Sequence, residues 1–305
     1  MLLSLLLSSF LTFVELNCEN LFDCHHDSLK QDTEFLPEGN KHWTAAKYWK
    51  KLNGIGQTIL SCSNDLPDVI VLCEVENDSV MRDLTRRSLL RNAGYEYLMT
   101  QSPDVRGLDV ALLYQPSSFH PLCYETIEVP ATLKGMRPTR DILYIKGLTR
   151  ARDTLHVFAV HAPSRRGGER KSRPFRLHAN AVLARHVRAV GSGQVVVMGD
   201  FNDYDTSESL QNMERLGLAN VTKGLQGKHG VGGTYRYQGK WRSLDHILVS
   251  EKLLAKVDSV YINDALFLLE EDSQQGGLRP RRSYHGRRYQ HGFSDHLPLV
   301  VRFRL

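Results

Sequence analysis

Residues 195–203 read VVVMGDFND, an apolar run followed by two acidic residues and an amide. Its first four residues are apolar, which is typical of a buried strand. Gly199 then lets the backbone turn closely, and Asp200 and Asn202 are two positions apart, so both side chains lie on one side of an extended segment. A simple Asx turn that closes the strand is the alternative. We predict a buried strand that ends in a carboxylate and an amide.

Eight further apolar runs read as buried strands, and helical patterns lie between several of them. The strands are expected at 10–16, 69–73, 110–114, 142–145, 155–160, 246–249, 257–262 and 299–303. The helices are expected at 43–59, 79–92, 175–190 and 207–216. Strands and helices mixed in this way predict an α/β layered domain, with two sheets packed face to face and helices outside.

The composition indicates a globular protein with a substantial core. Of its 305 residues, 41% are hydrophobic and 24% are charged, which excludes a disordered tail. Candidate site residues extend from Asn17 to His296, and a site assembled from both chain ends indicates a single domain over residues 1–305. The net charge of +5 fits an anionic substrate but also fits proteins that bind nothing anionic. Five irregularly spaced cysteines without a CxxC pair argue against a disulfide framework or a zinc site.

The first residues resemble the apolar part of a signal peptide, but they lack a basic start and a small-x-small cleavage site. We interpret residues 1–9 as a remnant of a signal segment or as an apolar lead-in to the first strand. A secreted or cell-envelope location is therefore favoured over the cytoplasm. A spanning helix needs about 20 apolar residues, so no stable membrane span is expected.

Hydrolysing a phosphodiester at neutral pH needs a cation to offset charge on the phosphoryl oxygens, a deprotonated water and stabilisation of the leaving oxygen. Magnesium suits this reaction because it keeps several waters and binds through one or two carboxylates plus the substrate phosphate. Isolated carboxylates at strand ends, accompanied by His and Asn, are therefore the residues that would carry this chemistry.

Two single residues stand at predicted strand ends. Glu74 follows the run 69–73, and His161 follows the run 155–160. The C-terminal ends of strands are where α/β sheets place their ligands. Taken alone, each residue is better explained as an ordinary solvated or packed strand end.

Asp-His pairs occur at two strand boundaries. Asp245 and His246 open one strand, and Asp295 and His296 precede the last strand. A carboxylate that orients an imidazole is a recurrent general-base arrangement. These pairs therefore favour acid-base chemistry at the strand ends.

Residues 279–291, RPRRSYHGRRYQH, hold five arginines and no acidic residue; we call them the arginine-rich segment. A solvated loop is the alternative, but its position just before the last Asp-His pair favours phosphate binding through Arg281 and Arg282. Arg106 is a further candidate for a phosphate contact. Tyr235 could stack on a base or sugar, although aromatic residues beside a strand more often pack against it.

Together these motifs resemble the endonuclease/exonuclease/phosphatase superfamily, the deoxyribonuclease-I-like group. The matching motifs, in order, are LNCENL with Asn17, VIVLCE with Glu74, AVHAPS with His161, GDFND with Asp200 and Asn202, SLDHILVS with Asp245, and SDHLPL with Asp295 and His296. The likeness covers nearly the whole chain. It points to a secreted or envelope-type bacterial branch with NCENLFD near its start.

The resemblance implies a four-layer α/β sandwich with two packed mixed β-sheets flanked by helices, and a site at the sheet edge. It implies a catalytic set of His161, Asp200, Asn202, Asp245 and His296, and a metal-binding set of Glu74, Asp295 and Asn17. Asp200 and Asn202 would position or deprotonate the attacking water. His296, oriented by Asp245, would be the base or a phosphate-binding imidazole. The implied cofactor is Mg²⁺, with Mn²⁺ or Ca²⁺ as alternatives, and a monomer is expected.

Two points of the resemblance stay open. His161 has no clear acidic partner, since Asp104 or Asp109 could serve and Asp109 could instead cap a strand. Glu19 stands where a carboxylate for a second metal can occur in the family, so the number of bound metal ions, one or two, stays open.

Three functions are compatible with these residues. The first is a metal-dependent phosphodiester hydrolase, a nuclease acting on nucleic acid. The second is a phosphomonoesterase or a sphingomyelinase-like phospholipase on the same fold, for which residues 265–270, ALFLLE, are the only apolar candidate for lipid contact. The third is a non-catalytic phosphate-binding module, which the complete set of carboxylates and imidazoles disfavours.

Overall fold

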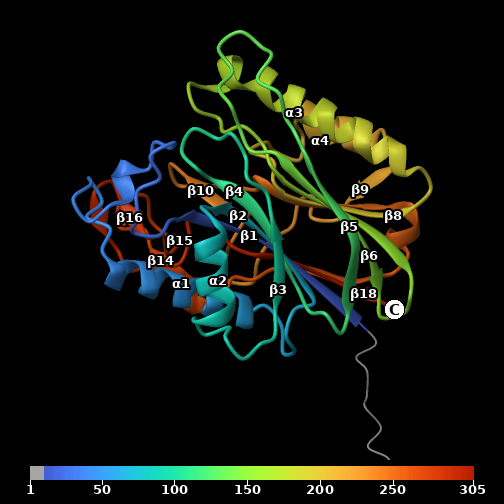
Figure 1. The fold of residues 1–305 in the computed structure, drawn as a ribbon, viewed down its shortest axis with the longest axis horizontal. Helices are drawn as coiled ribbons and strands as arrows, with labels where there is room; N and C mark the ends of the chain where they lie inside the picture. The colour runs from blue at the N-terminus through green and yellow to red at the C-terminus, as the bar shows by residue number, and fades with distance from the viewer. Residues whose placement is uncertain (1–9) are drawn as a thin grey trace, which may run out of the picture.

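Two six-stranded mixed β-sheets pack face to face, as Figure 1 shows for the computed structural model, which describes residues 10–305. The first sheet contains, in spatial order, β13 (Val257–Ile262), β18 (Leu299–Arg304), β1 (Phe10–Leu21), β2 (Val69–Val75), β4 (Asp109–Tyr114) and β3 (Glu96–Met99). The second contains β5 (Phe119–Ile127), β6 (Ile142–Thr149), β7 (Thr154–His161), β8 (Gln194–Asp200), β12 (Asp245–Ser250) and β9 (Leu218–Asn220). The interpretation of residues 1–9 as a signal remnant lies outside the described residues.

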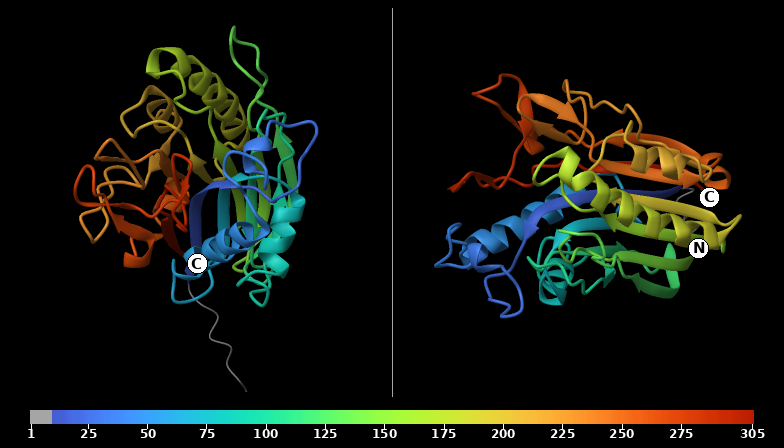
Figure 2. Two further views of the ribbon diagram at one scale, coloured as in Figure 1. Left: turned by 90° about the vertical axis from the view of Figure 1, so that its left-hand side faces the viewer. Right: turned by 90° about the horizontal axis from the view of Figure 1, so that it is seen from above.

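The helices are α1 (Ala45–Leu60), α2 (Asp78–Arg86), α3 (Glu169–Val190), α4 (Glu208–Glu214) and α5 (Glu251–Leu254). Helices α1 to α4 lie on the outer faces of the two sheets, as Figures 1 and 2 show, while Leu253 of the short α5 packs into the core between the sheets. Apolar residues of α1 and α2 pack on the first sheet, and those of α3 and α4 pack on the second. The predicted four-layer α/β sandwich is therefore confirmed. Within residues 10–305, no helix combines the length and apolarity that a bilayer crossing requires.

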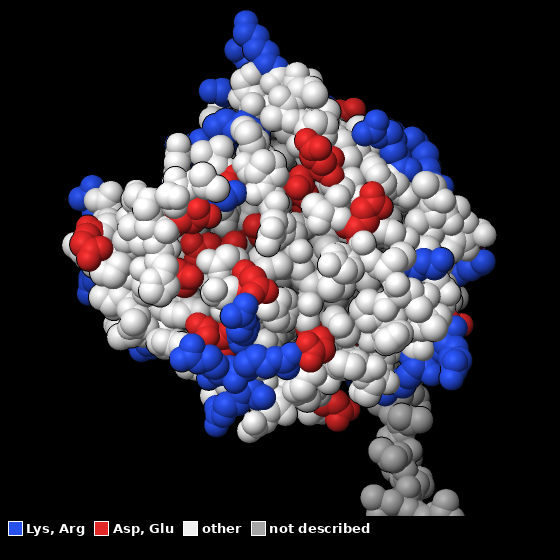
Figure 3. Space-filling view, in the orientation of Figure 1, with Lys and Arg blue, Asp and Glu red and all other residues white. Residues whose placement is uncertain are grey.

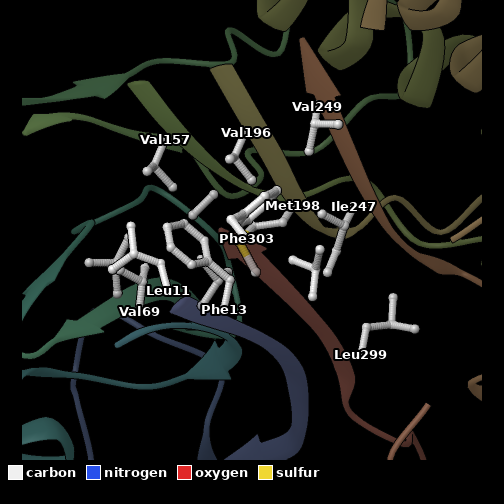
Figure 4. Close-up of a cluster of buried hydrophobic side chains, with 14 of the residues drawn as sticks. Leu11, Phe13, Val69, Val157, Val196, Met198, Ile247, Val249, Leu299 and Phe303 are labelled. Carbon is white, nitrogen blue, oxygen red and sulfur yellow. The ribbon is translucent and has the colours of Figure 1, made fainter. Parts of the chain in front are cut away.

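The main core lies between the sheets and is drawn in Figure 4. Leu11 and Phe13 of β1 point into this core, while Val14 and Leu16 of the same strand pack beneath the outer helices. A strand that is covered on both faces reads as a continuous apolar run, which is why sequence alone located it.

Several boundaries differ from the prediction. α3 begins at Glu169 and contains Pro174 near its start, whereas the prediction, which followed the apolar periodicity, started the helix at residue 175. Ion pairs of the buried Arg176 hold the first turns in place: its guanidinium lies 2.6 Å from the exposed Glu169 and 2.8 Å from the buried Asp203.

Segments that the prediction left between strands and helices contain short strands. They form three two-stranded ribbons: β10 (Tyr235–Tyr237) with β11 (Lys240–Arg242), β14 (Leu269–Glu271) with β15 (Leu278–Pro280), and β16 (Tyr284–His285) with β17 (Arg288–Tyr289). Two short 3-10 helices, η1 (Thr33–Phe35) and η2 (Leu266–Leu268), also lie outside the predicted strands and helices. The edge strands β3 and β5 were missed because β3 has only four residues and because most residues of β5 are exposed, so neither gives a long apolar run.

Candidate active site

The pairing of three neighbouring strands puts three predicted site residues in one row. At the end of β8, Asp200 lies opposite His161 of β7 and opposite Asp245 of β12. His296, which precedes β18 of the other sheet, joins this row, since ligand atoms of Asp200, Asp245 and His296 all lie within 4.8 Å of one another. The fold therefore brings residues from distant parts of the chain to one edge.

The first sheet contributes Asn17 and Glu74. The Asn17 side-chain amide donates to Asp200 Oδ2 at 3.0 Å, which joins the two sheets directly. An irregularity in the pairing of β2 with β4 falls at Glu74, whose Oε2 accepts the backbone N–H of Asn20 at 2.8 Å. Bulges of this kind redirect a side chain beside an active site.

Backbone strain gathers around these residues. The φ angles of Glu19, Asn20, Glu74 and Asn202 are 50°, 59°, 64° and 51°. Non-glycine residues seldom adopt this left-handed region, and such strain persists where the surrounding structure enforces it. Gly199 has a φ of 146°, and a Cβ there would lie 1.9 Å from the carbonyl oxygen of Val160. Glycine is therefore required just before Asp200.

His296 forms a buried pair with Asp245. Its Nδ1 lies 3.0 Å and 2.8 Å from the two carboxylate oxygens, and the Thr234 hydroxyl donates to the same carboxylate. Burial lowers the pKa of His296, but the carboxylate of Asp245 outweighs it and raises the pKa well above its ordinary value. The Tyr235 ring packs on the imidazole with centroids 4.9 Å apart. The imidazole is therefore held in place and positively charged.

Asp200 is a buried carboxyl group held by hydrogen bonds. Burial, and then the nearby charge of Asp245, raise the pKa of Asp200 to about 7, while His296 opposes this shift. The backbone N–H of Asn202 donates to Asp200 Oδ1 at 2.7 Å, and the Asn202 side-chain amide donates to the carbonyl oxygen of Ala162 at 3.1 Å. Asp200 is thus poised to change protonation near neutral pH.

His161 is neutral for a different reason. Burial lowers its pKa well below the ordinary value, and the charges of Arg140 and Arg106 lower it further. Its Nε2 lies 3.9 Å from Glu74 Oε1 and 3.7 Å from Asp200 Oδ2. The imidazole therefore faces the same small space as the two carboxylates.

The two acidic candidates for pairing with His161 have other partners. Asp104 lies 3.2 Å from the Arg140 guanidinium. Asp109 accepts the Thr100 hydroxyl at 2.6 Å and the backbone N–H of Ser102 at 2.8 Å. These bonds favour the structural alternative for Asp109.

Arg282 of the arginine-rich segment pairs with two acidic residues. Its guanidinium donates to Glu19 Oε1 at 3.2 Å and to Asp295 Oδ2 at 2.9 Å. Glu19 also accepts the backbone N–H of Ser283 at 2.6 Å and lies 3.8 Å from the buried ammonium of Lys51. This network holds Asp295 beside the site and ties the segment to β1.

The two other predicted arginines lie in different surroundings. Arg106 lines a cavity that reaches Glu74. The guanidinium of Arg281 lies 5.9 Å from the centre of the Phe293 ring. Arg106 therefore shares a cavity with Glu74, a predicted metal-binding carboxylate, whereas Arg281 does not line that cavity.

Sequence reasoning missed several residues that support the site. The Ser294 hydroxyl donates to the carbonyl oxygen of Asn17 at 2.6 Å and accepts the backbone N–H of His296 at 3.1 Å. Thr234 holds Asp245, and Lys51 lies beneath Glu19. The one available signal for Lys51 was its place among the buried apolar residues of a helix, where a lysine is unusual.

Glu15 lies behind the site, fully buried on β1. Within the described chain, neither of its carboxylate oxygens has a hydrogen-bond partner. Burial, followed by the charges of Asp245 and Asp200, raises its pKa well above the ordinary value. The group is therefore a neutral carboxylic acid between the sheets.

The donor chemistry fits a hard divalent cation. Glu74 and Asp295 keep 14% and 18% of their side-chain surface exposed, so their oxygens can reach an ion from the cleft side. Carboxylate and amide oxygens are the ligands that Mg²⁺, Mn²⁺ and Ca²⁺ prefer. Glu74, Asn17 and Asp295 offer such oxygens, but the group of mutually close ligand atoms among the described residues is Asp200, Asp245 and His296, so metal binding by the predicted set stays a prediction.

The sequence matches the model of the endonuclease/exonuclease/phosphatase family over residues 12–304. The chain belongs to this family. Family members are generally phosphoester hydrolases, and the match spans both sheets and every candidate site residue. A search of curated proteins gave no significant match.

Solved structures share the fold across nearly the whole chain. An endonuclease/exonuclease/phosphatase family protein from Bacteroides thetaiotaomicron has 15% identity and a TM-score of 0.65, with 97% of this chain and 98% of that chain covered. Humanized D. rerio TDP2 has 17% identity and a TM-score of 0.60, with coverages of 98% and 100%. The mannosyl-6-phosphatase of B. thetaiotaomicron VPI-5482 has 15% identity and a TM-score of 0.61, with coverages of 95% and 98%. At these identities the likeness establishes the fold alone.

Proposed function

We propose that this protein is a divalent-metal-dependent phosphodiester hydrolase that acts on nucleic acid. The observation that carries the proposal is the cluster of Asp200, Asp245 and His296, with ligand atoms within 4.8 Å of one another. Asn17 is bonded to this cluster, and Glu74 faces it across His161. Family membership supports hydrolysis of a phosphoester bond.

Each side chain has a role that follows from its charge state. A divalent cation held by Glu74, with Asn17 and Asp295 beside it, would offset negative charge on the phosphoryl oxygens. His296, charged through Asp245, would donate a hydrogen bond to a phosphoryl oxygen, which favours its phosphate-binding role over its role as base.

Asp200 is the residue best suited to take a proton from the attacking water. A general base works best when its pKa lies near the operating pH, and the pKa of Asp200 is about 7. Asn202 would keep the Asp200 carboxylate in position through its backbone N–H. His161, neutral and facing Glu74 and Asp200, would contact the phosphate from the opposite side.

The phospholipase alternative has little support from surface apolarity. In the ALFLLE segment, Leu266 is 64% exposed, whereas Leu268 and Leu269 are buried in the core. A phosphomonoesterase would use the same catalytic residues, so only the choice of substrate distinguishes it from a phosphodiesterase.

A substrate panel tests the proposal. Purified protein is assayed with Mg²⁺, Mn²⁺, Ca²⁺ or EDTA on plasmid, single-stranded oligonucleotide, inositol phosphates and sphingomyelin. We expect metal-dependent cleavage of the nucleic acids and a loss of roughly 10²–10⁴-fold in His296→Ala. A higher kcat/KM on inositol phosphates or sphingomyelin would assign the chain to one of the alternatives. No hydrolysis of any substrate by the folded protein would indicate a binding module.

A further inference from the structure

A basic cavity opens beside the candidate active site on the side of α3. Its volume is about 610 Å³, within the range of ligand-binding clefts, and Glu74 forms part of its wall. The loop between β5 and β6 and the first turns of α3 form much of the rest. Figure 3 shows Lys and Arg side chains gathered over this loop and the start of α3, at the top of the view. We call it the α3 cavity.

Four cations line the α3 cavity without an acidic partner. They are Arg106, Arg137, Arg166 and Lys171. Within residues 10–305, none of them forms an ion pair with a carboxylate, and the one other acidic residue of the wall, Asp104, is already paired with Arg140. The cavity therefore has an excess of positive charge.

Polar groups of the backbone and side chains add to this charge. The 22-residue helix α3 starts at the cavity, and its N-cap, Gly168, supplies no side-chain hydrogen bond to the first turn. Free N–H groups and the helix dipole make such an end favourable for anions. Thr139 in the cavity wall is 4% exposed, and its hydroxyl has no hydrogen-bond partner among the described residues. These groups could all bind the oxygens of an anion.

Two of the five arginines in the arginine-rich segment are already paired with carboxylates, whereas none of the four cations of the α3 cavity is paired in the described part of the chain. Arg279 lies 2.9 Å from Glu270, and Arg282 is engaged by Glu19 and Asp295. A guanidinium that already pairs with a carboxylate has fewer donors left for a phosphate. The free cations on the α3 side are therefore better placed to add affinity for an anion.

We propose that the α3 cavity binds a second phosphate of the substrate, next to the phosphate that is hydrolysed. This inference rests on the proposed function. Because Glu74 belongs to both the cavity wall and the candidate metal site, one substrate can occupy both. The substrate is accordingly a strand of nucleic acid, with phosphates continuing beyond the scissile bond, rather than an isolated phosphodiester.

Hydrolysis of dinucleotides tests this proposal. Thymidylyl-thymidine has one phosphate, and its 5′- and 3′-phosphorylated forms each carry one more. We expect one phosphorylated form to have a kcat/KM roughly 10-fold above that of the parent, as one charged contact of this strength would give. Arg137→Gln/Arg166→Gln should remove this preference and leave bis(4-nitrophenyl) phosphate hydrolysis unchanged.

The matched control is Arg185→Gln/Arg188→Gln, which removes the same charge from the exposed far part of α3. This control should keep the preference for the extra phosphate. Equal hydrolysis of all three dinucleotides by the wild type, or an equal loss in the two double variants, would overturn the proposal. A higher kcat/KM on inositol polyphosphates than on the dinucleotides would overturn the assignment to nucleic acid.

Binding separates failure of the cavity from failure of the proposed function. In Glu74→Gln, the affinity for a fluorescein-labelled thymidine octanucleotide is measured by anisotropy, which needs no hydrolysis. Adding Arg137→Gln/Arg166→Gln should weaken binding roughly 10-fold and make its salt dependence shallower by about one unit of slope per lost contact. Unchanged affinity and slope would overturn the cavity proposal, whether or not the wild type hydrolyses any phosphodiester.

Discussion

At the scale of single residues, the protonation states of the candidate site follow from burial and neighbours. His296 and His161 are both buried, yet the carboxylate of Asp245 raises the pKa of His296 while two arginines help to lower that of His161. Two imidazoles in one site thus carry different charges. The charged one can neutralise a phosphate, and the neutral one can share space with Glu74.

Asp245→Asn tests the charge on His296. Without the carboxylate, burial dominates and the imidazole becomes neutral, so we expect kcat to fall by roughly 10²–10⁴-fold with a smaller change in KM. Thr234→Val removes only the hydroxyl that donates to Asp245 and should cost less than Asp245→Asn. Steady-state kinetics across pH measures both, and an unchanged kcat in Asp245→Asn would contradict the role given to His296.

Residues with strand-end signals could be predicted from sequence. Asp200 and His296 stand in motifs with strong local patterns, and their ligand atoms lie within 4.8 Å of one another, while their roles stay predictions. Thr234 and Ser294 could not be predicted, because each acts through a bond to a residue of a distant segment or to a backbone group. Glu15 was read only as part of an apolar strand, because no neighbouring residue in the sequence indicates that its carboxyl group is neutral.

At the scale of elements, the buried strands and the edge strand β13 were predictable, whereas the edge strands β3, β5 and β9 were not. β2 and β8 are continuous apolar runs because both faces are covered. β5 and the two-stranded ribbons are half exposed, so their residues carry no clear period. The arginine-rich segment contains such ribbons, and its pairing with Glu19 could not be read from charge alone.

Asp141, just before β6, gives a pH-dependent prediction for stability. Burial raises the pKa of Asp141 to about 6, although its Oδ1 accepts the backbone N–H of Val129 at 3.1 Å. In the unfolded chain this carboxyl group loses its proton near pH 4. The contribution of Asp141 to the free energy of unfolding is therefore fully present below about pH 4 and is lost as the pH rises to about 6.

Asp141→Asn should therefore raise the Tm by a few degrees at pH 7.5, with a gain that fades toward pH 4. Thermal melts from pH 4 to pH 8 measure this dependence. Asp153→Asn is the control of opposite sign, since hydrogen bonding with Lys256 lowers the pKa of Asp153. A gain from Asp141→Asn that is the same at every pH would contradict the account.

At the scale of the whole molecule, two sheets meet so that strand ends from both halves of the chain surround one small volume. The bond from Asn17 to Asp200 and the pairing of His296 with Asp245 both cross between the sheets. This arrangement explains why the site residues are scattered along the sequence. The prediction of one domain over residues 1–305 is compatible with it and stays a prediction.

The most direct test of the candidate metal centre is the rate of bis(4-nitrophenyl) phosphate hydrolysis by the wild type and by Glu74→Gln, each with Mg²⁺ and with EDTA. Glu74 is partly exposed, so its amide variant should keep the wild-type Tm. We predict that hydrolysis by the wild type requires Mg²⁺ and that Glu74→Gln stays at the background rate in both conditions. Full wild-type activity in folded Glu74→Gln, or in the presence of EDTA, would contradict a metal-dependent centre at this position.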